Sequence, residues 1–223
     1  SVLHHAIKRG RSGRFAKLLL NHGADITKVE SGHAAYGYAY IHNNMDFCKA
    51  LEVAGSSTQV TTQEEFVNAI IRGDIEAARK LKENNPDIMQ QLHPSDMFIP
   101  ANLAMAPDSL SMFKAAHAAG WDLNKMTDEH KMPVLHMAAW NGRYKEVEYF
   151  LQLKPDLEFL NYYDATALGT AIHGSMHCPD SSKGDYIKCI NLLLDAGAEL
   201  RKDHGHLTMG SEEVYDYLQG RFG

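Results

Sequence analysis

A short two-helix unit recurs along the chain, and this recurrence restricts the possible folds more than any other feature. The clearest copy covers residues 133–157, PVLHMAAWNGRYKEVEYFLQLKPDL. Leu135 and Ala138 lie on one face of a first helix, Gly142 ends that helix, and Phe150 marks the apolar face of a second. A unit this short cannot bury its apolar face alone, so successive copies have to stack against one another.

The ending of this unit and its first helix both reappear elsewhere. An apolar helix runs into Gly and a short extension at 15–26, FAKLLLNHGADI, and at 190–200, INLLLDAGAEL, with weaker copies at Gly55 and Gly120. The L-H-x-A core of the first helix recurs at 3–6, and TALGTA at 166–171 keeps its Thr, Leu and Ala. These motifs resemble the ankyrin repeat. The resemblance implies an all-α fold, a solenoid of antiparallel helix pairs joined by β-turn or hairpin-like loops.

The repeat frame covers nearly the whole chain as a single domain, 1–223. It places repeats at about 1–28, 29–59, 60–91, 94–126, 128–160 and 161–202, with a degenerate cap at 203–223. The fourth repeat is weak because Pro107 shortens its first helix. In the sixth, the Gly, Ser and Pro residues of 173–185 predict a long loop between the helices. The abrupt start, with neither Met nor a helix cap, indicates a fragment of a longer chain.

Composition excludes several classes of partner. The net charge is -6, and the longest basic cluster, Lys8-Arg9-Gly10-Arg11, is interpreted as a solvated helix end, so nucleic-acid binding is not expected. No apolar run approaches the roughly 18 residues of a membrane helix. Three cysteines at no disulfide spacing favour a reducing compartment, which predicts the cytoplasm, although a leader missing from the fragment would change that prediction.

The resemblance implies that the chain, as a monomer, binds a partner protein with the turn tips and first-helix ends of its concave face. The residues expected at these positions are Ile41, His42, Arg72, Phe98, His130, Met132, Trp140, Asn141, Tyr162, Tyr163 and His173. Five of them, His130, Trp140, Tyr162, Tyr163 and His173, are expected to form one aromatic cluster of the kind that supplies interface hot spots. The alternative is that Trp140 and Tyr162 pack against their own stack.

Metal binding and catalysis have weak sequence support. His173, His177 and Cys178 are the candidates for a metal site, but their spacing lacks the second ligand pair of a structural zinc site, so no metal or cofactor is expected. Cys178 beside His177 has no recognisable orienting group, so the chain is not expected to be an enzyme. His4 and His136 are explained by the repeat, where this His hydrogen-bonds within the turn.

Three hypotheses about function remain open. The first is an interaction module that scaffolds, inhibits or regulates a partner protein. The second is the targeting domain of a larger enzyme, or a secreted bacterial effector. The third is a metal- or redox-responsive switch in the loop at 173–189.

Overall fold

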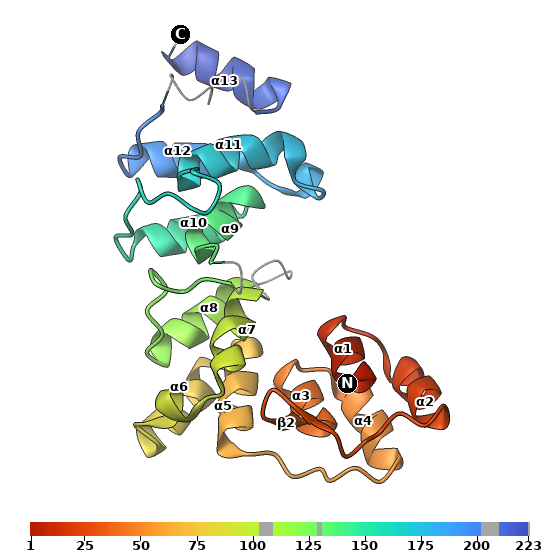
Figure 1. Cartoon of the computed structure of the whole chain (residues 1–223). Coiled ribbons are helices and arrows are strands. Elements are labelled where there is room, and N and C mark those ends of the chain that lie inside the picture. Colours follow the sequence, from red (N-terminus) through yellow and green to blue (C-terminus); the bar gives the residue numbers. More distant parts are fainter. Residues whose placement is uncertain (103–108, 129–130, 202–209, 223) are drawn as a thin grey trace. The chain divides into compact units, whose positions relative to one another are not determined.

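A computed structural model describes residues 1–102, 109–128, 131–201 and 210–222 (Figure 1). Its contacts gather into two compact units. Unit 1 contains residues 1–100 and 111–120, and unit 2 contains residues 101–110 and 121–223. Each unit is described by itself below, and the organisation of the chain as one repeat domain stays a prediction.

Unit 1 is built from short helix pairs and one two-stranded hairpin. In chain order, its elements are α1 (Val2–Lys8), α2 (Gly13–Asn21), β1 (Val29–Glu30), β2 (His33–Ala34), α3 (Ala35–Ile41), α4 (Met45–Val53), α5 (Thr62–Ile71), α6 (Ile75–Asn84), and the 3-10 helices η1 (Ile88–Gln91) and η2 (Pro94–Phe98). Two further helices, α7 (Ile99–Asn102) and α8 (Ser109–Ala118), cross the division between the units. Strands β1 and β2 pair antiparallel, so the turn before α3 has the hairpin form expected for this repeat.

Unit 2 is also built from short helix pairs. Its elements are α9 (Val134–Trp140), α10 (Tyr144–Leu151), α11 (Ala167–His177), the 3-10 helix η3 (Ser181–Lys183), α12 (Tyr186–Asp195) and α13 (Glu212–Phe222). None of the helices in the described part of the chain is long and apolar enough to cross a membrane.

Local capping explains where these helices begin. The Thr61 hydroxyl accepts the backbone N–H of Glu64, while the Glu64 carboxylate accepts that of Thr61, which forms a capping box at the start of α5. Thr166 caps α11, and Asp185 caps α12 through the N–H of Lys188. The beginnings of these helices are therefore encoded locally, whereas their lengths depend on packing.

The core lies between equivalent helices of successive repeats. In unit 1, α1 packs against α3, α3 against α5, and α2 against α4; in unit 2, α9 packs against α11 and α10 against α12. Four phenylalanines, Phe47, Phe66, Phe113 and Phe150, are among the largest fully buried side chains. Burying each contributes roughly 1.5–3 kcal/mol. Stacking, more than helix propensity, therefore stabilises helices this short.

The histidines of the two L-H-x-A motifs link successive repeats. His4 Nε2 donates to the carbonyl oxygen of His33 at 2.9 Å, and His136 Nε2 donates to that of Phe159 at 3.1 Å. The sequence interpretation expected this His to hydrogen-bond within the turn. His4 does contact Ser1 there, at 2.7 Å between Nδ1 and Oγ, but the bond common to both histidines reaches the turn of the next repeat.

The segment 173–185, predicted to be a loop, is helical in its first half. Helix α11 extends to His177, which leaves residues 178–185, with the short η3, as the connection to α12. The extension is possible because Gly174 lies so close to the Trp140 carbonyl of α9 that a Cβ there would overlap with it. Close packing of α11 on α9 thus overrides the loop preference of Gly and Ser.

Candidate functional site

Three aromatic rings lie in a row at the C-terminal ends of α9 and α11. The ring centroids of Trp140 and His173 are 5.5 Å apart, and those of His173 and His177 are 4.3 Å apart. Trp140 and His173 are half-buried, while His177 is exposed. We call these three residues the Trp–His ladder. Two of them, Trp140 and His173, were predicted to lie together, and the structure brings them into contact.

The main chain of Trp140 is held firmly in place. The buried Tyr186 of α12 donates its hydroxyl hydrogen to the Trp140 carbonyl oxygen at 2.9 Å. Burial, assisted by the neighbouring Cys178, raises the pKa of Tyr186, so its hydroxyl keeps the proton that it donates. Trp140 therefore has a fixed backbone and a ring supported on one side by His173.

The connection 178–185 packs against the corner that follows Trp140. Asn141 Nδ2 donates to the Met137 carbonyl at 2.6 Å, and the Cys178 thiol approaches Asn141 Oδ1 at 3.7 Å. The backbone N–H of Asp185 donates to the Gly142 carbonyl at 2.9 Å. Asn141 was predicted to contact a partner, but its amide group is engaged within the protein and supports the corner.

Two exposed tyrosines occupy the tip of the turn before α11. Tyr162 is 82% exposed and Tyr163 is 74% exposed, with their ring centroids 5.5 Å apart in an edge-to-face arrangement. The buried Asn161 fixes the turn, because its Oδ1 accepts the backbone N–H groups of Tyr163 at 2.8 Å and Ala165 at 3.2 Å. We call Tyr162 and Tyr163 the tyrosine tip, a pair of exposed aromatic side chains on a turn that hydrogen bonds hold in place.

The ladder and the tyrosine tip lie at different ends of α11. His173 comes six residues after Ala167, the first residue of the helix, and the tip precedes that residue. A rise of 1.5 Å per residue puts them about 9 Å or more apart along the helix axis. The single cluster predicted from the sequence is therefore two surfaces. Met132 lies near the turn, with its sulfur 3.5 Å from Asn161 Nδ2, and His130 lies outside the described residues.

The remaining predicted contacts belong to unit 1. Ile41 is fully buried, so it offers no surface to a partner. His42 is half-buried, with its ring 4.6 Å from that of Tyr38, and burial lowers its pKa to about 4. Arg72 is exposed and pairs with Asp74 at 3.3 Å, and Phe98 is exposed. Arg72 and Phe98 are the most exposed of these four residues.

The residues proposed as metal or redox candidates face the protein interior in part. Cys178 and Cys189 are both buried, and burial raises the pKa of the Cys189 thiol. Among the residues that the structure describes, no group of three His, Cys, Asp or Glu side chains is arranged to hold a metal ion. His173 and His177 instead contact each other through their rings. The geometry gives these residues a packing role.

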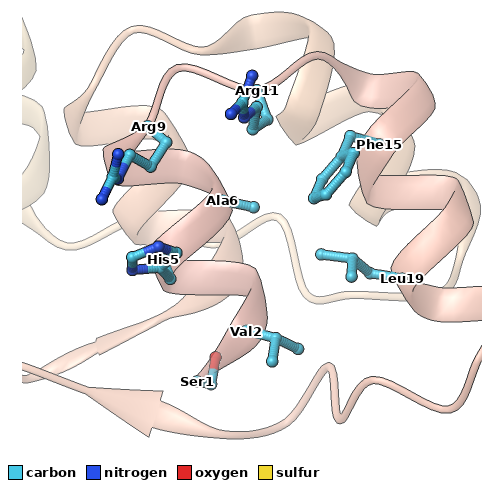
Figure 2. Close-up of a pocket in the computed structure, with 8 residues that line it drawn as sticks. All are labelled: Ser1, Val2, His5, Ala6, Arg9, Arg11, Phe15 and Leu19. Atoms are coloured by element: carbon cyan, nitrogen blue, oxygen red, sulfur yellow. The ribbon is translucent and has the colours of Figure 1, made fainter.

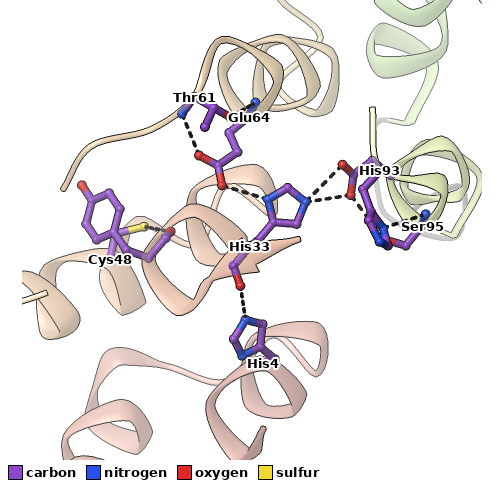
Figure 3. Close-up of polar contacts among 9 residues, drawn as sticks. His4, His33, Cys48, Thr61, Glu64, His93 and Ser95 are labelled. Carbon is purple, nitrogen blue, oxygen red and sulfur yellow. Dashed lines mark hydrogen bonds and ion pairs between the residues drawn. The ribbon is translucent and has the colours of Figure 1, made fainter. Parts of the chain in front are cut away.

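A buried charged network in unit 1 was not predicted (Figure 3). His33 Nδ1 lies 2.8 Å from Glu64 Oε1, and His33 Nε2 lies 3.0 Å from Asp96 Oδ1. All three side chains are buried. Burial by itself would lower the pKa of His33, but hydrogen bonds to Asp96 and Glu64 and their negative charges raise it to about 9. His33 is thus a cation between two carboxylates, an arrangement that we call the ion triad.

Comparisons with known proteins agree with this architecture. A family model described as ankyrin repeats (many copies) matches residues 103–151. The crystal structure of the human ASB11 ankyrin repeat domain is similar over 100% of this chain and 98% of its own, with a TM-score of 0.55 and 18% identity. The chain has the ankyrin repeat fold. This finding confirms both the resemblance and the fold class predicted from the sequence.

A second solved ankyrin repeat structure gives the same result. The ankyrin repeat domain of Bcl-3, described as a unique member of the IkappaB protein family, covers 99% of this chain and 98% of its own, with a TM-score of 0.50 and 17% identity. No curated protein sequence matches the chain. At these identities, the likeness concerns the fold alone.

In the second repeat of this ankyrin fold, the ion triad takes the place of the histidine that the L-H-x-A motif would supply. Gly37 precedes Ala39 by two residues, as His4 precedes Ala6, so glycine stands where the histidine is expected. A Cβ at Gly37 would overlap with the Glu64 carboxylate, which fills this space and accepts a hydrogen bond from His33 Nδ1. The glycine at this position, together with the capping box of α5, is the sequence signal that could have revealed the site.

Replacing Gly37 with Ala is expected to destabilise unit 1 by about 1–2 kcal/mol, because the new methyl group displaces the Glu64 carboxylate from a buried hydrogen bond. Urea unfolding followed by circular dichroism measures the change. The control is Gly220→Ala, since a Cβ at Gly220 meets nothing within 4 Å. An equal loss of stability in both variants would contradict the assigned role of Gly37.

Proposed function

We propose that this ankyrin repeat chain binds another protein through the Trp–His ladder, with the tyrosine tip as a second contact. The observation that carries the proposal is the state of Trp140, which is half-buried and held by Tyr186 and His173. Ankyrin repeat domains generally serve as protein interaction modules, and the fold supports that class of function here.

Trp140 has the physical properties of an interface hot spot. Tryptophan is enriched at such positions because it buries a large area and has only two side-chain torsions to fix. The supported ring and fixed backbone of Trp140 lower the entropy lost on binding. Met176, 59% exposed and next to His177 in sequence, adds apolar surface on the same helix. A partner that covers the ladder would therefore gain affinity from a preformed surface.

The chain acts by binding and not by catalysis in this proposal. A nucleophile requires a base in hydrogen-bond reach and a group that orients the base. The Cys178 thiol instead approaches the Asn141 amide oxygen, and Cys189 is fully buried. The same surface would serve a scaffold, an inhibitor, or the targeting domain of a larger enzyme or effector. Burial of both thiols gives less support to a redox switch.

The double variant Trp140→Ala/His173→Ala is expected to lower recovery of the partner by at least roughly tenfold, because it removes the anchoring ring and its support. Affinity purification from the native source, with quantitative mass spectrometry, compares it with the unmodified chain. Tyr162→Ala/Tyr163→Ala should give a smaller loss.

Val53→Ser is the matched control, since Val53 is 75% exposed and belongs to unit 1. It should recover every partner at the unmodified level. Melting curves of all variants separate loss of binding from loss of folding. A folded double variant that still recovers the same proteins in the same amounts would exclude the ladder as the binding surface.

A further inference from the structure

A groove runs between α1 and α2 of unit 1 (Figure 2). Its volume is about 540 Å³, which falls within the range of ligand-sized pockets. Val2 and Ala6 of α1 face Phe15 and Leu19 of α2 across it, and Arg11 lies at one end. The apolar walls stay accessible, with Val2 59% exposed and Phe15 39% exposed.

The groove lies in the most basic part of an acidic chain. Residues 1–24 contain five Lys and Arg residues and no Asp or Glu, while the whole chain has a net charge of -6. The five cations, Lys8, Arg9, Arg11, Arg14 and Lys17, are all exposed. Two residues of the cluster that the sequence alone presented as a solvated helix end, Arg9 and Arg11, therefore line an open groove with apolar side chains.

Most of these charges are not neutralised by the protein itself. Arg9, Arg11, Arg14 and Lys17 have no ion-pair partner among the described residues. The nearby Asp46 carboxylate accepts the backbone N–H of Gly13 at the start of α2. Unpaired cations around apolar side chains favour a ligand with negative charge and an apolar group.

We propose that the α1–α2 groove binds an acidic segment of a partner protein, with an apolar side chain of that segment inserted between Phe15 and Val2. Carboxylates of the segment would pair with Arg9 and Arg11, which both line the groove. A membrane surface fits less well, because interfacial helices present a protruding apolar face. Here, the apolar side chains face one another within a recess.

The test uses a fluorescein-labelled synthetic peptide of Glu and Asp that contains one Phe and one Leu. Fluorescence anisotropy with the full chain at low salt should show saturable binding. Arg9→Glu/Arg11→Glu should weaken the binding at least roughly tenfold, and Phe15→Ser should weaken it as well. A peptide with Ser in place of Phe and Leu should bind several-fold more weakly, because it lacks the inserted group.

The matched control reverses the charge of two exposed lysines elsewhere in unit 1. Lys49→Glu/Lys80→Glu changes the net charge by the same amount and should leave the affinity nearly unchanged. Equal loss in both double variants, or equal binding of the Ser peptide, would overturn the proposal in favour of unspecific charge attraction.

Two further experiments test whether a lipid surface or a second copy of the chain occupies the groove instead of an acidic segment. Stronger, saturable binding to phosphatidylserine vesicles that depends on Arg9 and Arg11 would overturn the proposal in favour of a lipid surface. Sedimentation velocity of the chain alone measures self-association. Oligomers that the Arg9→Glu/Arg11→Glu variant abolishes would make a second copy of the chain the occupant. Since the groove excludes the ladder residues, the Trp140 variant should bind the peptide normally, so the two proposals can fail separately.

Discussion

Replacing His33 with Gln should destabilise unit 1 by about 3–5 kcal/mol, because it removes the cation between two buried carboxylates. Glu64 and Asp96 are 5% and 1% exposed, so water cannot replace the lost interaction without opening the structure. Gln keeps hydrogen-bonding capacity but carries no charge. The loss of stability therefore comes mainly from the two carboxylates, which remain buried without a cation.

Urea unfolding measured by circular dichroism should show this loss, and hydrogen exchange should locate it in α3 and α5. Both tryptophans of the chain, Trp121 and Trp140, lie in unit 2, so their fluorescence monitors the other unit separately. His22→Gln is the matched control because His22 is exposed in unit 1 and its Nδ1 donates to the Leu18 carbonyl oxygen of α2, outside the ion triad. An unfolding free energy within about 1 kcal/mol of the unmodified chain would show that the ion triad has little net effect.

A compensating variant distinguishes charge from packing. Combining His33→Gln with Glu64→Gln and Asp96→Asn leaves three neutral side chains that can hydrogen-bond with one another. This triple variant should recover part of the stability lost by His33→Gln alone, since no unpaired charge remains. A further decrease would mean that the three side chains act through shape and not through charge.

The fold could be predicted from the sequence because its signals are local. The L-H-x-A helices and the Gly endings lie within single repeats, so one pass along the chain identifies them. The ion triad could not be predicted in the same way. His33 is 31 residues from Glu64 and 63 residues from Asp96, and only the stacking of repeats brings them together.

The candidate site was predicted in part for a related reason. Trp140 and His173 occupy equivalent positions of adjacent repeats, so the repeat frame places them side by side. The frame does not give distances along the helix axis, so it did not predict that the tyrosine tip is separate from the ladder. It also does not give burial: Ile41 occupies the position of the exposed Lys8, but its apolar side chain is buried.

The stability of the chain should be greatest near pH 6.5 and fall on both sides. On the alkaline side, folded His33 keeps its proton up to about pH 9, whereas in the unfolded chain it loses the proton near pH 6.5. The stabilisation is therefore complete below pH 6.5 and lost as the pH rises through 9. The difference between the two pKa values corresponds to about 3 kcal/mol.

On the acidic side, the half-buried His42 ring produces the opposite dependence. Its folded pKa is lowered to about 4, mainly by burial, and its Nε2 is buried without a hydrogen-bond partner. Between pH 6.5 and 4 the unfolded chain binds a proton that folded His42 does not, so stability falls as the pH falls. Burial lowers the pKa values of His4 and His136 in the same direction.

Unfolding free energies between about pH 5 and 10 separate the two limbs of this profile. His33→Gln should flatten the alkaline limb and leave the acidic limb in place. His42→Phe should flatten part of the acidic limb, because Phe keeps the ring contact with Tyr38 and has no proton to bind. An alkaline limb that persists in His33→Gln would assign it to another group, and the ion triad would then not hold its proton in the folded state.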